Sequence, residues 1–236
     1  MDIDFKYAYL ILDIPFFVIW VLFFLLSKET RKEQLIMSVL FIPAGPLSEL
    51  LYFSDYWAPA SVFSFSIGPV IVYIEDLIFA FALGGVGSVI YEAIFSKILS
   101  VPKGSVHYVI AIPLIILVGG LVTVSLFLLG VNSIFATSLG FIVAALLIVS
   151  QRKDLFIDSL LSGVLITVIM FIAYGVLIVF IPNTNELIRQ GWLLYGTQFD
   201  IRILGIPLTE MMWYFTWGMV AGPLYEFARK MKFERT

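Results

Sequence analysis

The sequence predicts an all-α, polytopic membrane protein of about seven transmembrane helices. Of its 236 residues, 61% are hydrophobic and only 13% are charged, and the mean hydropathy is +1.04. This apolar content lies far above that of a water-soluble domain. The apolar runs also reach the roughly 20 residues that a helix needs to cross a bilayer, whereas the strands of a membrane barrel alternate over roughly 10 residues.

The predicted spans follow one another along the chain with few long connections. The amino terminus is acidic and the first apolar run is longer than the core of a signal peptide, so this run is predicted to be the first span. The uninterrupted apolar windows are 7–27, 35–53, 69–95, 108–129, 134–150, 155–181 and 203–228.

The basic residues predict the orientation of these spans. With the amino terminus outside, all 14 Lys and Arg residues except Lys6, Arg189 and Arg202 fall in the inner connections or the inner carboxyl terminus. This asymmetry follows the positive-inside rule, and an even number of spans would remove it. We therefore expect the amino terminus outside and the carboxyl terminus inside, in the plasma membrane of a prokaryote.

The third and seventh windows repeat one another at a constant offset. Asp76 aligns with Glu210 and Glu92 with Glu226, without a gap. The order of spans and connections around them also repeats, which predicts two parallel three-helix repeats related by an axis along the membrane normal. The expected units are a first repeat over 1–96, a linker helix over 97–131 and a second repeat over 132–236.

Carboxyl groups within the spans are the first functional candidates, because ionisable side chains are costly in lipid. They are Asp13, Glu49, Glu75, Asp76 and Glu210. Helical geometry places Asp76 and Glu210 on the same faces as small residues, so we expect Glu75, Asp76 and Glu210 to surround one water-poor cavity. At least one of them should then stay protonated at neutral pH. The alternative is that these acids only form hydrogen bonds between helices.

Aromatic residues gather around these acids in the sequence. Their ring faces can stabilise a cation, although ordinary helix packing is the better explanation for any single ring. The predicted substrate-binding set is Tyr73, Phe79, Phe81, Trp213, Tyr214 and Trp217.

Other residues that the two windows share are interpreted as structural. Glu92 and Glu226 lie near the inner ends, where a carboxylate can reach water or basic neighbours, and are interpreted as interfacial anchors. Gly218 and Gly222 form a Gly-x-x-x-Gly pattern, and a looser version begins at Gly84, so both are predicted to be helix contacts.

The composition argues against several chemistries. The chain has no cysteine, and its single histidine, His107, is interpreted as a plain interfacial residue, so a metal or haem site is not expected. No lysine lies within a span to anchor a retinal, and no nucleotide-binding motif is present. We therefore predict no cofactor, no metal and no nucleic-acid partner.

The acidic pair and its surroundings resemble the lycopene cyclase domain family of small membrane-bound carotenoid cyclases, in its fused two-domain form. Segment 69–79 carries Glu75 and Asp76 before an aromatic residue, and Gly84-Gly85 and Tyr91-Glu92 follow. Segment 205–215, with Glu210, looks like the same motif in the second half. The resemblance covers essentially the whole chain, including the order of three helices, one linker helix and three helices.

The resemblance implies a cofactor-independent isomerisation in lipid. An acid protonates the terminal double bond of a linear carotenoid, the carbocation closes a six-membered ring, and a base removes a proton. The family pattern implies that Glu75 and Asp76 are the acid and base, with Glu210 as the equivalent group. Two positions depart from it: Tyr73 stands where the family commonly has proline, and Thr209 replaces one acid of the second copy.

Three functions remain open from the sequence. The first is a lycopene-type cyclase, an intramolecular lyase or isomerase that takes a lipid-soluble polyisoprenoid from the surrounding membrane lipids. The second is a proton-coupled small-molecule transporter, since duplicated bundles with intramembrane acids also suit transport. The third is a non-catalytic carotenoid- or polyprenoid-binding subunit, which the loss of an acid at Thr209 favours. An oligomer, or a partner from the carotenoid pathway, is open in each case.

Overall fold

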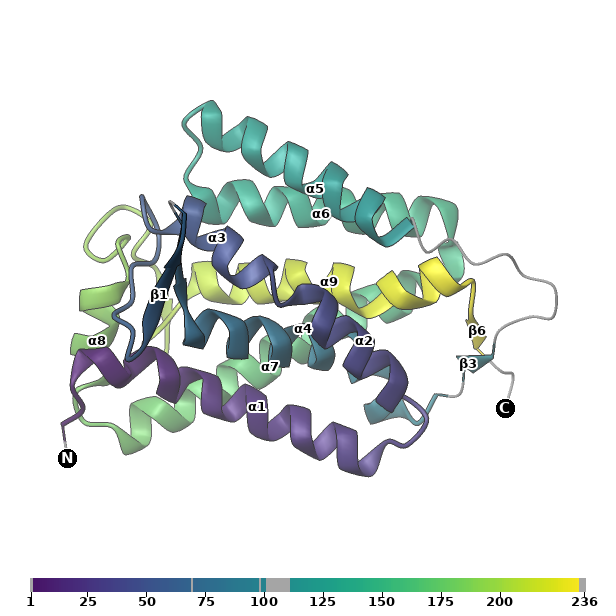
Figure 1. Ribbon diagram of the computed structural model, residues 1–236, viewed down its shortest axis with the longest axis horizontal. Helices are drawn as coiled ribbons and strands as arrows, with labels where there is room; N and C mark the ends of the chain where they lie inside the picture. Colours follow the sequence, from purple (N-terminus) through teal and green to yellow (C-terminus); the bar gives the residue numbers. More distant parts are fainter. Residues whose placement is uncertain (1, 69, 98, 101–110, 234–236) are drawn as a thin grey trace.

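The computed structural model describes the chain as an elongated helical bundle with two short β-hairpins at one end and the pair of strands β3 and β6 at the other (Figure 1). It describes residues 2–68, 70–97, 99–100 and 111–233. His107 and Lys103, to which the sequence assigned places near the inner surface, lie outside the described residues.

Helices form most of the described chain. They are α1 (Ala8–Leu26), α2 (Arg31–Phe41), α3 (Ala44–Tyr52), α4 (Ile74–Phe95), α5 (Ala111–Leu128), α6 (Ser133–Gln151), α7 (Phe156–Phe180), α8 (Thr184–Gly191) and α9 (Leu208–Arg229), with short turns η1 (Phe5–Tyr7) and η2 (Lys153–Leu155). The strands are β1 (Ser64–Ile67), β2 (Val70–Tyr73), β3 (Leu99–Ser100), β4 (Arg202–Ile203), β5 (Ile206–Pro207) and β6 (Lys232–Phe233). They pair antiparallel as β1–β2, β3–β6 and β4–β5.

Several helices have the length and composition of membrane spans. Among the described residues, 5 helices are long and apolar enough to cross a bilayer, and 6 if the bent pair α2–α3 is one span. Helix α9 is 22 residues long but more polar, since it carries Glu210, Glu226 and Arg229. The structure is consistent with an integral membrane protein, while the count of seven spans and the repeat of three helices stay predictions.

The second predicted window is not one straight helix. Helices α2 and α3 are bent by 42° where they meet. Pro43 lies at this junction with a φ of −65°, and Pro46 follows in the first turn of α3. Proline lacks a backbone N–H and its ring clashes with the preceding turn, so a break is expected here.

The third and seventh helices begin later than predicted, because a β-hairpin precedes each of them. Gly68 has a φ of 60° and Gly205 a φ of 87°, a backbone region that glycine adopts without strain in tight turns. Helix α4 therefore starts at Ile74 rather than at 69, and α9 at Leu208 rather than at 203. The candidate acids consequently lie in the first turn of each helix, not deep within a span as expected.

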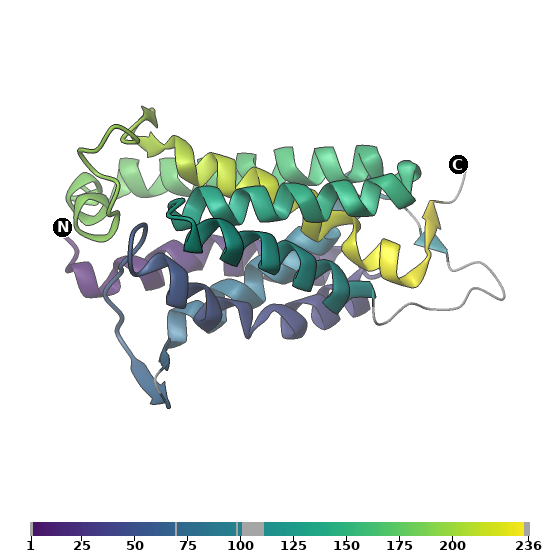
Figure 2. The same ribbon diagram turned by 90° about the horizontal axis from the view of Figure 1, so that it is seen from above.

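Helices α4 and α9 form the centre of the bundle (Figures 1 and 2). Helices α1 and α2 contact α4, helices α6 and α7 contact α9, and α5 lies against α6. An added Cβ on Gly84 would lie 2.7 Å from the Cβ of Phe41, and one on Gly218 would lie 2.7 Å from the Cα of Gly163. The predicted small-residue helix contacts are therefore confirmed.

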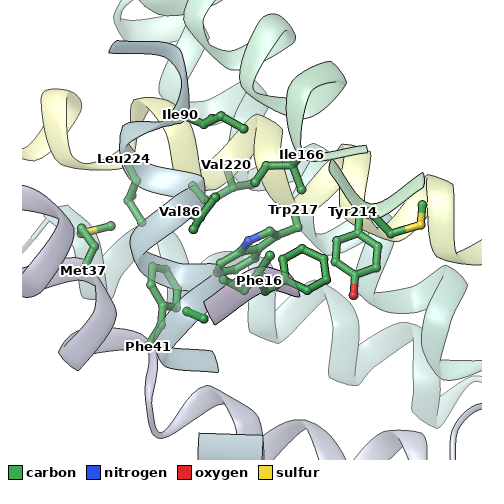
Figure 3. Packing of buried hydrophobic residues seen from close by; sticks show 14 of the residues in the cluster. Phe16, Met37, Phe41, Val86, Ile90, Ile166, Tyr214, Trp217, Val220 and Leu224 are labelled. Atoms are coloured by element: carbon green, nitrogen blue, oxygen red, sulfur yellow. The ribbon is translucent and has the colours of Figure 1, made fainter. Parts of the chain in front are cut away.

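The hydrophobic core lies between these central helices and their neighbours (Figure 3). Val86 of α4 and Leu224 of α9 are fully buried, and the ring of Phe16 stacks on that of Tyr214 with 5.5 Å between centroids. Such dense aromatic and aliphatic contacts fix the positions of α1, α4 and α9 relative to one another. This core supports the wall of the cavity described below.

The two ends of the bundle differ in charge. The α1–α2 and α6–α7 connections and the end of α9, which carry most of the described basic residues, lie at one end (Figure 1). Helix α8 and the hairpins before α4 and α9 lie at the other end. The first turns of α4 and α9 therefore lie far from the basic end.

Candidate active site

A cavity of about 370 Å³ lies among α1, α2, α3, α4, α5, α6, α7 and α9, and the residues of α1, α4, α7 and α9 that line it come mostly from the halves of these helices nearer α8. Its wall is largely aromatic, and the rings that line it include Phe16, Phe41, Phe79, Phe141, Trp213, Tyr214 and Trp217. Among the described residues, Glu49 and Glu210 are the carboxyl groups that line it. An apolar cavity with a few convergent polar groups is the usual form of a site for an apolar ligand.

Glu210 is held by two tyrosine hydroxyls. The hydroxyl of Tyr56 donates a short hydrogen bond to Oε1, and the hydroxyl of Tyr174 donates to Oε2 over 3.2 Å. Burial, followed by the nearby Glu210 carboxyl, raises the pKa of the Tyr56 hydroxyl well above its usual range, so this hydroxyl stays a donor. The two hydroxyls therefore fix the orientation of the Glu210 carboxyl in the cavity wall.

The loop that carries Tyr56 is fixed from both sides. The backbone N–H of Leu193 donates to the carbonyl of Tyr56 over 2.8 Å. The backbone N–H of Ser133, at the start of α6, donates to the Asp55 carboxylate over 2.9 Å. A carboxylate at a helix amino terminus is stabilised by the unpaired N–H groups there, so Asp55 holds this loop against the second half of the chain.

Asp76 lies just behind the cavity wall. It is fully buried, and its Oδ2 accepts a hydrogen bond of 3.4 Å from the backbone N–H of Tyr73. The Glu49 carboxyl and the Tyr9 hydroxyl are its side-chain neighbours. A Cβ on Gly45 would clash with the Asp76 carbonyl oxygen, so a glycine at this position lets α3 approach the start of α4.

Glu75 faces a different neighbourhood. It accepts a hydrogen bond of 2.6 Å from the Ser61 hydroxyl and one of 2.8 Å from the backbone N–H of Val62. Both partners belong to the loop before β1, and Glu75 does not line the cavity. Glu75 therefore holds this loop against the first turn of α4.

The predicted aromatic set divides in the same way. Phe79, Trp213, Tyr214 and Trp217 line the cavity. Tyr73 instead contacts Phe53 with 5.4 Å between ring centroids, and Phe81 contacts Trp20 at 4.9 Å. The structure does not bring Tyr73 and Phe81 to the cavity, because each lies on a different face of its element.

The expectation of three carboxyls around one chamber is thus met only in part. The structure brings Glu210 to the cavity, places Asp76 behind Glu49, and leaves Glu75 in a loop contact. Glu49 was expected within a span but not at the site, and no sequence pattern indicated Tyr56 or Tyr174. The catalytic roles of these groups remain predictions.

A second set of buried acids lies toward the basic end of the bundle. Glu92 is 2% exposed and Glu226 is fully buried, so the expectation that they reach water as interfacial anchors is wrong. They lie near Glu33 of α2 and Asp158 of α7, two acids that helix packing brings in and that sequence spacing did not connect. Among the described residues, no group of three or more acids, histidines or cysteines has a geometry that could hold a metal ion.

Comparison with known proteins gives one match. The family model described as lycopene cyclase matches residues 132–228, the segment from the start of α6 to the end of α9, which contains Tyr174 and Glu210. Neither the curated proteins nor the solved structures contain a match. The predicted resemblance to the lycopene cyclase family is therefore confirmed over residues 132–228.

Proposed function

We propose that this protein is a membrane-embedded cyclase of lycopene-type carotenoids or related polyisoprenoids. The observation that carries the proposal is the position of Glu210, which faces an aromatic cavity within the segment that matches the lycopene cyclase family. The reaction is an isomerisation by acid and base, with no cofactor and no exchange of electrons. It needs a proton donor, a base and a water-poor cavity that stabilises a cation.

The reaction begins when an acid transfers a proton to the terminal double bond of the substrate. The resulting carbocation is attacked by a neighbouring double bond, which closes a six-membered ring. A base then removes a proton from the ring and a new double bond forms, so the product has the same composition as the substrate. Glu210, which accepts two hydroxyl hydrogen bonds, suits the role of the base, and a second carboxyl group supplies the proton.

The aromatic wall supports the cationic intermediate. The rings of Trp213 and Trp217 stack with 6.1 Å between centroids, and Phe141 approaches Trp217 edge-on at 5.4 Å. Ring faces attract a cation by about 0.5–2 kcal/mol each, and apolar walls keep out the water that would otherwise trap a carbocation.

The cavity also offers a route from the lipid. Its lining includes Leu47 of α3, which is 57% exposed, and Ile116 of α5, which is 42% exposed, so it opens between these two helices. Gly120 lines the same opening, and a Cβ at this position would meet no atom within 4 Å. A long polyisoprenoid could therefore place one end in the cavity while the rest of its chain lies between α3 and α5 or in the bilayer.

The location of the protein follows from the same proposal. We place it in the plasma membrane of a prokaryote, with the basic end of the bundle at the cytoplasm and the amino terminus outside. The cavity then lies toward the outer side of the membrane, where a hydrocarbon substrate reaches it from the lipid without crossing water. An oligomer, or a neighbour that supplies the linear substrate, is compatible with this placement.

Expression in a host that accumulates lycopene tests the function. We expect pigment extracts to contain a product with one or two cyclised ends, identified by its retention on a column and by its absorption spectrum. A host that carries the protein in its membranes but contains only linear carotenoid would contradict the carotenoid assignment. Co-purification of unchanged carotenoid would then favour the binding subunit, and proton flux in liposomes would favour the transporter.

A further inference from the structure

We infer that Glu49 is the proton donor of this site, and that Asp76 is a positioning residue that shares the proton with it. The inference rests on the proposed function and names a residue outside the predicted acidic motif. Four observations support it: the position of Glu49 in the cavity wall, its unpaired oxygen, its contact with Asp76, and the glycine that allows this contact.

Glu49 is the carboxyl of the first repeat that reaches the cavity. It lies on α3, is 6% exposed and lines the cavity. Its Oε2 is buried and has no hydrogen-bond partner. A buried carboxyl oxygen without a partner is unfavourable unless it carries or meets a proton, so this side chain is suited to act on a ligand in the cavity.

Asp76 keeps a proton at this position. The two carboxyls are close neighbours, and two like charges this close in a water-poor site cannot both persist. One proton shared between them removes the repulsion and forms a strong hydrogen bond. The Tyr9 hydroxyl, Asp13 of α1 and the adjacent Glu75 also lie close to Asp76. These neighbours are two further carboxyls and a hydroxyl, and none of them is basic.

The bend between α2 and α3 brings the pair together. Pro43 breaks the helix, and Gly45 contacts the backbone of Asp76 so closely that any Cβ would clash with its carbonyl oxygen. Glu49 follows one turn later on α3, which is the spacing that places it on the same side as Gly45. Glu49 therefore lies between Asp76, in the first turn of α4, and the cavity.

The two carboxyls of the cavity then have opposite roles. Glu49 transfers its proton to the less substituted carbon of the terminal double bond of the substrate, so its O–H bond and the π bond break, a C–H bond forms and the other alkene carbon becomes the carbocation. Glu210 then takes a proton from a carbon of the ring. The C–H bond at this carbon breaks, its electrons form the new double bond, and an O–H bond forms on Glu210. Glu210 then releases this proton and the Glu49–Asp76 pair takes one up, so the number of protons on the protein is the same before and after each turnover. Such a division between two carboxyls in different environments is a common solution for acid–base catalysis.

The test compares Glu49→Gln with Glu186→Gln in the lycopene-accumulating host, with both variants quantified in the membrane fraction. Glu186 lies on helix α8 with its side chain 43% exposed, so its variant is a control for the same chemical change. Since general acid catalysis contributes about 10²- to 10⁴-fold, we expect Glu49→Gln to lower the initial rate of product formation at least ~100-fold at equal protein content. Asp76→Asn should lower it less, and the double variant Glu49→Asp with Asp76→Glu, which preserves the combined length of the pair, should recover activity over Glu49→Gln.

An infrared measurement separates this inference from the proposed function. Purified wild-type protein in detergent, compared in H₂O and D₂O, should show a protonated carboxyl band that is absent in Glu49→Gln and present in Glu186→Gln. If the wild type forms product and Glu49→Gln forms it equally fast, the inference is overturned while the function stands. If the wild type forms no product, transfer of a proton from Glu49 to a polyisoprenoid is refuted together with the proposed function. If the carboxyl band is unchanged in Glu49→Gln, the proton shared by Glu49 and Asp76 is refuted as well.

Discussion

The close contact between α7 and α9 predicts a specific loss of stability when Gly218 becomes alanine. A Cβ on Gly218 would lie 2.7 Å from the Cα of Gly163 and 2.7 Å from the Ser162 carbonyl oxygen. Both are backbone atoms and cannot rotate away, so the helices themselves must separate. Gly175 of α7 is the matched control, because a Cβ there would meet no atom within 4 Å.

The difference between the two variants isolates the contact. Each change gains about 1 kcal/mol of helix propensity, and this gain cancels when the variants are compared. Inserting a methyl group into a packed interface costs about 1–3 kcal/mol, and rigid neighbours place Gly218→Ala in the upper half of this range. We therefore expect Gly218→Ala to be about 2–3 kcal/mol less stable than Gly175→Ala, which is roughly a 30- to 150-fold difference in the unfolding equilibrium.

Denaturation in detergent micelles, followed by helical circular dichroism as a function of denaturant, measures this difference. Product formation should fall together with stability in Gly218→Ala, because α7 and α9 carry Tyr174 and Glu210. Equal stability of the two variants would show that the helices do not pack through backbone at this point, and the reasoning about the small-residue contacts would be refuted.

Three further predictions follow from the site and the surface. Glu210→Gln should lower the rate of product formation about 10²- to 10⁴-fold without loss of protein from the membrane, since glutamine keeps an oxygen that can accept from Tyr56; full activity would remove Glu210 from the mechanism. Gly120→Phe should slow product formation by narrowing the opening between α3 and α5, whereas Gly175→Phe, on another face of the bundle, should not, and equal rates would exclude this route. Hydrogen bonds from Arg189 and then Gln190 lower the pKa of Glu186 to about 2, so the contribution of this carboxylate to stability is present above its ordinary pKa of 4.5 and is lost as the pH falls through about 2. Arg189→Gln should therefore raise the pKa of Glu186 in a carbon-13 NMR titration, and an unchanged value would contradict the ion pair.

The hydrophobic pattern was sufficient to predict the helices but not their ends. Long apolar runs are determined locally, which is why the windows at 7–27, 134–150 and 155–181 lie close to α1, α6 and α7. The starts of the third and seventh helices were predicted five residues too early, because the strands before them are as apolar as a helix turn. Gly68, Gly205 and Pro207 were the local signals of a hairpin, and Pro43 was the signal of the bend in the second window.

The site was harder to predict because it depends on contacts between distant segments. Glu210 lies at the cavity as expected, since its helix face was readable from the sequence. The hydrogen bond from Tyr56 spans 154 residues, and no periodicity indicates which loop tyrosine will reach α9. Glu75 and Asp76 are adjacent in sequence, yet the first turn of a helix directs neighbours to different sides, so only Asp76 approaches Glu49.

Isotope incorporation tests the central claim most directly. Isolated membranes containing the protein are supplied with unlabelled lycopene in D₂O, and the product is analysed by mass spectrometry. If a carboxyl group donates a solvent-derived proton and another removes one from the ring, each cyclised end should carry one deuterium and the product made in H₂O should have the mass of the substrate. A product without deuterium, or one that differs from the substrate by two hydrogens, would contradict acid–base cyclisation at Glu49 and Glu210.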